Sequence, residues 1–279
     1  MAIFKSAKIC VTDRYLRHQR AKNRVMKFYK YQGTGNDFVV IDDREEAFPI
    51  SQKYIADLCH RRFGIGADGL MLLQNAEGYD FRMVYFNADG TEGSMCGNGG
   101  RCLVRFAHDL GIIGDSTLFI AIDGEHQAKV TSEVIYLKMI DVNQIERTEN
   151  YDFMNTGSPH YVTYTDNLQN VDVYTQGRAI RYNEPFVSRG GTNVNFVEVI
   201  GDNNLEVRTY ERGVEDETYA CGTGVTACAL SANSRFGFEK AIDVKVVGGN
   251  LRIEFDSTET GYENIYLIGP AVKVFEGFF

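Results

Sequence analysis

Two cysteines of this chain lie in near-copies of one short motif. The segment MCGNGG at residues 95–100 recurs as ACGTGV at residues 220–225, which places Cys96 and Cys221 125 residues apart. A thiol can accept or donate a proton, so two thiols that face each other can exchange protons with one carbon atom from opposite sides. The repeat therefore predicts the chemistry of a racemase or an epimerase.

Other residues recur at the same offset, and they indicate that a whole domain is duplicated. The matched pairs are Gly66 with Gly191, Tyr85 with Tyr210, Gly97 with Gly222, Gly99 with Gly224 and Gly124 with Gly249, while Asp68 falls on Asn193 and Asn87 on Arg212. One Cys-Gly-x-Gly turn is weak evidence for catalysis, because tight strand–helix turns use glycine for structural reasons. Its repetition in halves that otherwise share few identities favours a catalytic role.

The elements around each cysteine predict its environment. In each half a strand, expected at 83–86 or 207–210, leads through a polar turn to the cysteine, and an apolar helix follows. A helix N-terminus carries free amides and the positive end of the helix dipole, and both lower the pKa of a thiol. The neighbouring glycines leave those amides open to a substrate carboxylate, whose developing negative charge they can stabilise.

The hydrophobic patterns predict an α+β protein of two pseudo-symmetric, duplicated domains, each a β-sheet wrapped around a central helix, with the active site in the cleft between them. We expect the halves to span 26–141 and 142–279, and the final strand, within 265–279, can cross back to the first half. Expected strands lie at 27–31, 38–42, 80–86, 117–122, 128–131, 134–139, 161–165, 195–200, 205–210, 242–247, 251–255 and 265–267. Expected helices lie at 51–62, 101–110, 171–181 and 225–235.

Composition and charge narrow the class of partner. The chain of 279 residues is long enough for two domains, and it contains no apolar run that could span a membrane. Its net charge of −9 disfavours nucleic acid, so we expect small molecules or another protein chain as partners. Residues 1–25 carry seven basic side chains against Asp13 alone and lack the apolar core of a secretion signal. We interpret them as a basic N-terminal extension outside the fold rather than as a functional arm.

The remaining cysteines do not indicate disulfides or a metal. Without a secretion signal we expect a cytoplasmic protein with reduced thiols. Cys102 and Cys228 lie in apolar runs, which is typical of buried, inert thiols, and Cys10 and Cys59 carry no other context. The cysteine spacing differs from that of a zinc ribbon, and the sequence has no P-loop and no H-E-x-x-H motif. We expect no metal and no cofactor, although sequence alone leaves a lysine-bound pyridoxal group open.

Beyond the cysteine motifs, an ordered series of blocks resembles the cofactor-independent diaminopimelate epimerases from about Met26 to the C-terminus. The blocks are GTGNDF at 33–38, RRFGIGADG at 61–69, NADG at 87–90 before CGNG at 96–99, TGSPH at 156–160, NVNF at 193–196, ERG at 211–213 before CGTG at 221–224, and GPA at 269–271. The resemblance implies a two-domain fold and the interconversion of L,L- and meso-diaminopimelate, in bacterial lysine and cell-wall precursor synthesis. It also implies a homodimer.

The same resemblance assigns the central chemistry to four side chains. Cys96 and Cys221 correspond to the two acid/base thiols, one removing the α-proton as thiolate while the other, as thiol, protonates the opposite face. His160 and Glu211 correspond to the groups that tune these thiols, and both can accept or return a proton. Without the resemblance, His160 would be interpreted as a loop histidine after a proline.

Substrate binding is implied in the same way. The amides of Gly97, Asn98, Gly222 and Thr223 would hold the reacting carboxylate. The distal end of the substrate would be bound by Asn36, Asn87, Asn193 and Arg212, the last through a bidentate pair, and Glu211 would also contact the substrate. Taken alone, each asparagine would be interpreted as a turn residue. Gly69 and Ser158 depart from the pattern of some members, which have glutamine and asparagine there.

Three alternatives accompany this interpretation. A proline- or hydroxyproline-type racemase also uses two thiols, but its substrate lacks a distal carboxylate, and Arg212 with the three asparagines argues against it. A related family of the same fold isomerises other metabolites without paired cysteines, and Cys96 with Cys221 argues against that. A non-enzymatic thiol redox or metal-binding module is the third, which a metal assay and a thiol count would test.

Overall fold

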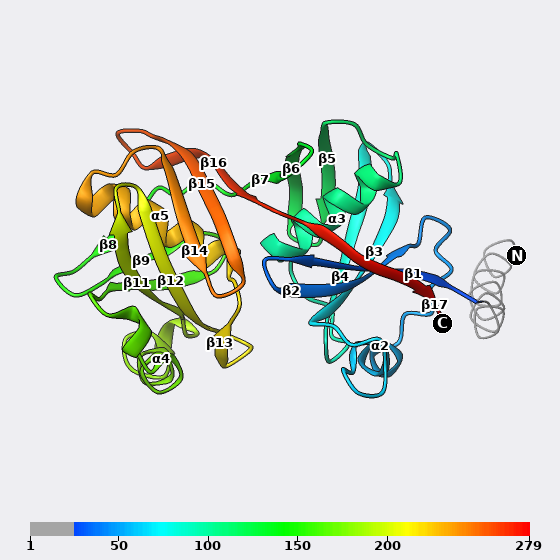
Figure 1. Cartoon of the computed structure of the whole chain (residues 1–279), viewed down its shortest axis with the longest axis horizontal. Helices are drawn as coiled ribbons and strands as arrows, with labels where there is room; N and C mark the ends of the chain where they lie inside the picture. Colours follow the sequence, from blue (N-terminus) through cyan, green and yellow to red (C-terminus); the bar gives the residue numbers. More distant parts are fainter. Residues whose placement is uncertain (1–24) are drawn as a thin grey trace, which may run out of the picture.

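The computed structural model describes residues 25–279. Nearly all of the basic extension and Cys10 lie outside the described residues. The fold is α+β, as the sequence predicts, and Figure 1 shows two bodies of strands, each containing one long helix.

The first half is a sheet of seven strands with two helices. The strands are β1 (Lys27–Gly33), β2 (Asn36–Asp42), β3 (Gly69–Ala76), β4 (Tyr79–Asn87), β5 (Ser116–Ala121), β6 (Gly124–Val130) and β7 (Ile135–Lys138), and the helices are α2 (Gln52–Cys59) and α3 (Gly97–Asp109). Neighbouring strands pair in chain order. The β2–β3 and β4–β5 pairs are parallel and the others antiparallel.

The second half repeats this order of strands. Its strands are β8 (Glu146–Arg147), β9 (Asp152–Asn155), β10 (Pro159–Tyr164), β11 (Asn193–Gly201), β12 (Asn204–Glu211), β13 (Asp216–Thr218), β14 (Ala241–Val246), β15 (Gly249–Ser257) and β16 (Tyr262–Gly269), and its helices are α4 (Val173–Arg181) and α5 (Gly222–Phe236). The pairs β10–β11 and β12–β14 are parallel, and the pairs β9–β10, β11–β12, β14–β15 and β15–β16 are antiparallel. The strand series β1–β7 and β9–β16, without the short β13, therefore have the same connectivity, which confirms the duplication.

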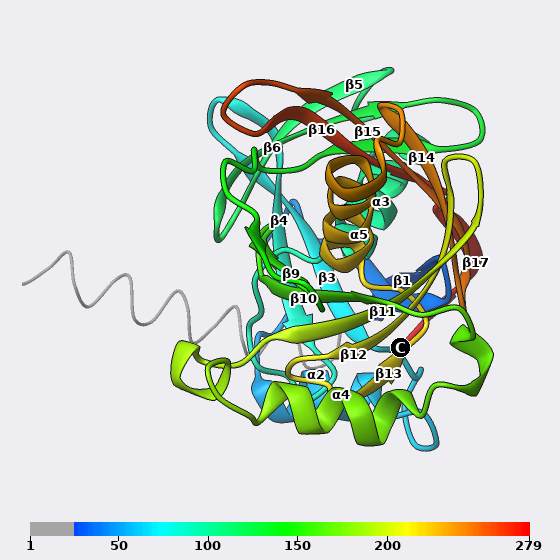
Figure 2. The same ribbon diagram turned by 90° about the vertical axis from the view of Figure 1, so that its left-hand side faces the viewer.

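Each sheet curves around its own helix. Most of α3 is buried, and the helix packs on β1, β2, β3, β6 and β7. Helix α5 is buried in the same way among strands of the second half, and Figure 2 shows it at the centre of its ring of strands. Such burial explains why most residues of both helices are small or apolar, since a buried helix face needs no polar side chains.

Two strand pairs join the halves. Strand β16 pairs with β7, Leu267 lying opposite Leu137. The last strand, β17 (Val272–Phe278), runs back across the molecule and pairs antiparallel with β1, as Figure 1 shows in red and blue. The C-terminal strand therefore completes the edge of the first sheet.

The sheet register corrects the expected alignment of the halves by one residue. Buried Leu70 and Phe86 pair across β3 and β4, and buried Val194 and Tyr210 pair across β11 and β12, so these strands match at an offset of 124. The counterpart of Tyr210 is thus Phe86. The two cysteines keep the offset of 125, because the connection before Cys221 is one residue longer.

This register changes two expected equivalences at the site. Asn87 ends β4 as Glu211 ends β12, so Asn87 corresponds to Glu211 and not to Arg212. Gly69 begins β3 as Asn193 begins β11, so Gly69 and not Asp68 is the counterpart of Asn193. One half therefore carries an amide where the other carries a carboxyl group.

Candidate active site

The two cysteines occupy equivalent positions at helix N-termini. Cys96 is the N-cap residue of α3, and Cys221 is the N-cap residue of α5. Both helices begin at the glycine directly after the cysteine, three or four residues before the expected starts at Arg101 and Val225. The prediction that each thiol lies at a helix N-terminus is confirmed.

The two helix ends meet at the junction of the halves. A Cβ atom added to Gly97 would lie 3.8 Å from the Cα of Gly222, and one added to Gly222 would lie 3.6 Å from the Cα of Gly97. The side chain of Leu267, from β16, fills the remaining space, since its Cδ2 would lie 2.7 Å from a Cβ at Gly222. The two glycines therefore let the helix ends approach closely, and a larger residue at either position would have to displace Leu267.

The pKa of each thiol is raised, which corrects the expected lowering. Burial is the main cause for both, and the negative charge of Glu211 adds to it. The amides of Asn98 and Gly99 do lower the pKa of Cys96, as a helix N-terminus should, but burial outweighs them. Both thiols are therefore protonated in the structure without substrate.

Asn36 contacts Cys96 because a tight turn places it there. Thr34 and Gly35 have φ values of 56° and 84°, which form a two-residue hairpin turn between β1 and β2. Asn36 follows, and its Oδ1 accepts a hydrogen bond from the Cys96 Sγ at 3.7 Å. Its Nδ2 donates to Asp68 at 2.6 Å, which fixes the orientation of the amide. Asn36 therefore lies beside the Cys96 thiol.

Asn98 links the two halves directly behind the thiols. Its Nδ2 donates to Asn36 at 3.3 Å and to the backbone carbonyl of Ala220, the residue before Cys221, at 2.8 Å. Its Oδ1 accepts from the guanidinium of Arg101 at 3.1 Å. Asn98 is buried, and its side chain holds the second cysteine motif against the first.

Arg101 is a fully buried cation whose hydrogen-bond partners are neutral oxygens. It donates to Gly97 O at 3.4 Å and to Thr34 Oγ1 at 3.0 Å besides Asn98, and its Nε has no partner among the described residues. The acidic groups that it influences are the thiols of Cys96 and Cys102. Sequence analysis missed this residue, although a charged side chain inside an otherwise buried helix is a signal of function.

Glu211 lies where its charge reaches both thiols. It raises the pKa of Cys96 and of Cys221. Burial raises its own pKa, the carboxylate of Asp68 adds to this, and a hydrogen bond from Thr218 at 2.9 Å opposes it. A carboxylate whose pKa is raised by burial is a stronger base than an exposed one.

His160 is buried in the second half and reaches Cys221 through a hydroxyl group. Its Nε2 lies 2.8 Å from Thr223 Oγ1 and 2.9 Å from Ser158 Oγ, and Thr223 Oγ1 lies 3.5 Å from the Sγ of Cys221. Burial lowers the pKa of His160 to about 3, helped by the positive charge of Arg212. The imidazole is therefore neutral at physiological pH.

Of the remaining sequence-predicted residues, Asn193 and Arg212 lie near His160, and Asn87 lies away from the thiols. Asn193 is buried beside His160, where it donates to Ser158 at 3.1 Å and accepts from the backbone N–H of Arg212 at 2.8 Å. The guanidinium of Arg212 donates to the carbonyl of Gly190 at 3.3 Å. Asn87 is exposed at the end of β4 and donates to Thr91 at 3.3 Å, so the structure does not bring it into contact with the thiols.

Gly69 leaves room for an aromatic ring. A Cβ atom at this position would lie 2.5 Å from Cε2 of Tyr85 and 2.6 Å from the carbonyl oxygen of Phe86. The raised pKa of Tyr85 comes mainly from burial, and Cys96, Asp68 and Glu211 add to it. A phenol group therefore stands directly beside Gly69.

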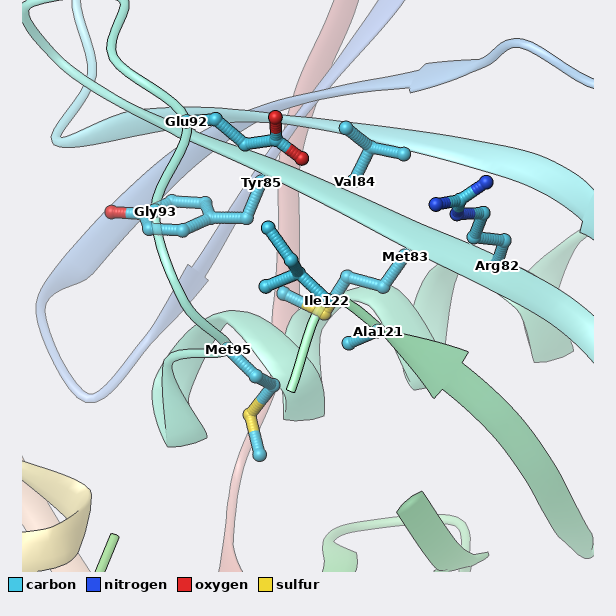
Figure 3. Close-up of a pocket in the computed structure, with 9 residues that line it drawn as sticks. All are labelled: Arg82, Met83, Val84, Tyr85, Glu92, Gly93, Met95, Ala121 and Ile122. Carbon is cyan, nitrogen blue, oxygen red and sulfur yellow. The ribbon is translucent and has the colours of Figure 1, made fainter. Parts of the chain in front are cut away.

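A small hollow behind the Cys96 turn is separate from the thiol site. Figure 3 shows it between β4 and the turn, with Tyr85, Gly93 and Met95 on one side and Ala121 and Ile122 on the other. Its volume of about 10 Å³ is close to the least that holds one water molecule. It cannot receive an amino acid.

Residues 25–279 contain no group of three or more His, Cys, Asp or Glu side chains that could hold a metal ion. In the same residues, no helix is both long and apolar enough to cross a membrane.

Comparison with known proteins gives the family. A family model described as diaminopimelate epimerase matches residues 28–137 and 153–274. The diaminopimelate epimerase of Flavobacterium psychrophilum is 50% identical over 254 residues, covering 90% of this chain and 99% of that protein. Among solved structures, a PhzF-family phenazine biosynthesis protein from Bacillus anthracis has a TM-score of 0.72 at 14% identity, covering 92% of this chain and 99% of that one. A hydroxyproline epimerase from Agrobacterium vitis has a TM-score of 0.64 at 12% identity, covering 92% of each chain, and at such identities the likeness concerns the fold alone. The chain belongs to the diaminopimelate epimerase family.

Proposed function

We propose that this protein is an isomerase that interconverts L,L- and meso-diaminopimelate, by proton transfer between Cys96 and Cys221 at the α-carbon, in lysine and cell-wall precursor synthesis. The observation that carries the proposal is the meeting of two helix N-termini, each capped by a cysteine, through Gly97 and Gly222. One thiolate removes the α-proton, and the opposite thiol donates a proton to the other face of the carbon.

The helix ends supply the electrostatic part of the mechanism. The backbone amides of Gly97, Asn98, Gly222 and Thr223 lie in the first turns of α3 and α5, where amides have no partner within the helix. A carboxylate held there gains negative charge when the α-proton leaves, and the amides stabilise that charge in place. No metal and no organic cofactor enters this scheme.

We assign specificity to the second half and to Asn36. Arg212 and Asn193 are joined by a hydrogen bond of 2.8 Å and lie next to His160, so a distal carboxylate bound by Arg212 would hold the substrate across the thiols. Asn87, Asn36 and Glu211 complete the proposed contacts with the substrate. A proline- or hydroxyproline-type racemase needs no such cation, which favours a dicarboxylic substrate.

The test is incubation with L,L-diaminopimelate in deuterated water. Epimerisation by two thiols predicts formation of the meso isomer, with one solvent deuteron at the inverted carbon of the product. Proline and hydroxyproline serve as competing substrates in parallel incubations. Turnover of those substrates with none of diaminopimelate would overturn the assignment, and metal binding without any turnover would favour the metal-binding module.

The cellular setting and the assembly belong to the same proposal. We place the protein in the cytoplasm, where thiols stay reduced, and we expect a homodimer. An exposed apolar edge supports the dimer, because Val272, Val274, Phe275 and Phe278 on β17 are each at least 45% exposed. We take 26–141 and 142–279 as the two halves of the working enzyme, with residues 1–25 outside them.

A further inference from the structure

The side-chain amide of Asn195 has one possible orientation. Its Nδ2 lies 2.9 Å from the backbone carbonyl oxygen of Tyr161, which can only accept a hydrogen bond. Its Oδ1 accepts from the hydroxyl of Thr209 at 3.0 Å. A reversed amide would set oxygen against oxygen at Tyr161, and water cannot relieve this because Asn195 is fully buried.

This orientation decides which ring nitrogen of His160 carries the proton. Nδ2 of Asn195 also lies 3.1 Å from the Nδ1 of His160, so Nδ1 must accept a hydrogen bond. The imidazole is neutral, and its single proton is therefore on Nε2. In this state Nε2 is a donor and cannot act as a base toward Thr223.

The proton on Nε2 gives the neighbouring hydroxyl groups a direction. Thr223 Oγ1 can accept a hydrogen bond directly from Nε2 at 2.8 Å. Alternatively, Nε2 donates to Ser158, whose hydroxyl group lies 3.2 Å from Thr223 Oγ1 and donates to it in turn. The hydroxyl proton of Thr223 is then free to point at the Sγ of Cys221, 3.5 Å away. A donor aimed at a sulfur atom stabilises the thiolate relative to the thiol.

The first half offers its thiol the backbone amides of Asn98 and Gly99 as donors, but no side-chain donor. The residue at the position of Thr223 is Asn98, whose amide turns away toward Asn36 and Ala220. The Sγ of Cys96 faces Oδ1 of Asn36, and the carboxylate of Asp68 holds that amide so that its oxygen points to the sulfur. A fixed acceptor stabilises the S–H form of Cys96.

We propose that Asn195 and Thr223 are positioning residues that hold a hydrogen-bond donor at Cys221, so that Cys221 ionises before Cys96. The inference rests on the proposed two-thiol function. It adds which thiol is the first to ionise in the substrate-free protein, and it gives a role to the side chains of Asn195 and Thr223.

The charged and titratable groups around the pair do not all act in the same direction. Glu211, from β12, faces both thiols and raises the pKa of each, and Cys228 lies on the same helix as Cys221. Arg101 acts against the proposal, because its positive charge favours an anion at Cys96. Tyr85 faces Cys96 from β4, and Arg212 faces His160. Burial and Glu211 also raise the pKa of Cys221 further than that of Cys96, so the proposal requires the Thr223 donor to outweigh both effects.

The test is the pH dependence of alkylation of each cysteine by iodoacetamide in the substrate-free protein, quantified by peptide mass spectrometry. The midpoint in pH is compared rather than the rate, because limited access of the reagent lowers the rate of alkylation but does not change the pKa of the thiol. The proposal predicts a lower midpoint for Cys221 than for Cys96 in the unmodified protein. Equal midpoints, or a lower one for Cys96, would overturn it.

Variants of Thr223 test the mechanism of this difference. Thr223→Val removes the hydroxyl and keeps the backbone amide, and it should raise the Cys221 midpoint by about 1 pH unit while leaving the Cys96 midpoint in place. Thr223→Ser should restore the original midpoint. Thr226→Val is the matched control, because the Thr226 hydroxyl donates within α5 to Gly222 O at 3.0 Å and should not affect either thiol. An unchanged Cys221 midpoint in folded Thr223→Val would overturn the proposal.

Asn195→Leu tests the first link of the chain. The ¹⁵N resonances of His160 should show a proton confined to Nε2 in the unmodified protein and a mixture of tautomers in the variant, with a raised Cys221 midpoint. A proton on Nδ1 in the unmodified protein would contradict the argument, and should either variant fail to fold, the two midpoints of the unmodified protein decide alone. These measurements need no turnover, so they fail or succeed separately from the proposed epimerase activity.

Discussion

At the scale of single residues, we expect Arg212 to determine the substrate specificity. Replacing it with alanine would remove the proposed charge-assisted contact to the distal carboxylate, a loss of about 2–5 kcal/mol. Arg212→Ala should therefore raise KM steeply, and it should also lower kcat if distal binding positions the reacting carbon between the thiols. Arg212→Lys should restore activity only in part, because an ammonium group cannot form the planar two-bond contact. Steady-state kinetics on both isomers would check this, and unchanged constants in Arg212→Ala would remove the dicarboxylic substrate.

His160 predicts a specific dependence of stability on pH. Its pKa is about 3 in the folded protein against an ordinary value of 6.5, so the unfolded chain binds a proton between these values while the folded one does not. The stability is therefore full above about pH 6.5 and falls as the pH falls toward 3. Between pH 7 and pH 5 this one group should cost about 2 kcal/mol.

Urea unfolding of the original protein and of His160→Asn at these two pH values isolates that contribution, since every other group titrates alike in both proteins. The variant should lose about 2 kcal/mol less stability between pH 7 and pH 5. Equal losses would show that the imidazole is not buried in its neutral form.

At the scale of elements, the close approach of α3 and α5 depends on two glycines. A methyl group at position 222 would lie 2.7 Å from Leu267 Cδ2, so Gly222→Ala should push the helix ends apart, lowering both turnover and the melting temperature. Adding Leu267→Ala should recover part of the turnover by making room. Gly114→Ala is the matched control, because no atom lies within 4 Å of a Cβ there and it should change neither quantity. Full activity in Gly222→Ala would contradict the proposed geometry.

The elements also show what sequence patterns can and cannot predict. The helix starts expected at Arg101 and Val225 lie later in the sequence than the observed starts of α3 and α5. The reason is that glycines occupy the first turns, and glycine is a poor helix former, so the pattern of apolar residues begins only after them. Strand β3 was missed altogether. Its first five residues, Gly69 to Leu73, are all buried, and a strand covered on both faces lacks the alternation that identifies strands.

The sequence predicts the position of some residues of the site but not of others. The thiols at helix ends followed from local spacing, because the motif, the strand before it and the helix after it are adjacent in the chain. Arg101, Asn195 and Asp68 received no role, because their importance lies in contacts between segments far apart in sequence. The equivalence of Asn87 with Arg212 was wrong, since one inserted residue before Cys221 shifts the offset without leaving a sign in the motif.

At the scale of the whole molecule, the C-terminal strand ties the two halves together. Strand β17 pairs with β1 along its length, and Phe275 and Phe279 pack against Phe28 of the first core. Ending the chain after Ala271 should expose the edge of β1 and lower the melting temperature and the turnover together. A chain that begins at Met26 is the matched control, and it should keep both values. An intact melting temperature after removal of 272–279 would show that the halves do not depend on this strand.

The central claim is that two thiols, one from each half, act on the same α-carbon, one removing its proton and the other donating a proton to the opposite face. The most direct measurement is the interconversion of L,L- and meso-diaminopimelate by Cys96→Ser and by Cys221→Ser, each compared with the original protein under reducing conditions. A serine hydroxyl is a far weaker base at neutral pH, so each variant should lose interconversion by at least about 100-fold while keeping its fold. Full interconversion by either variant would contradict the two-thiol account.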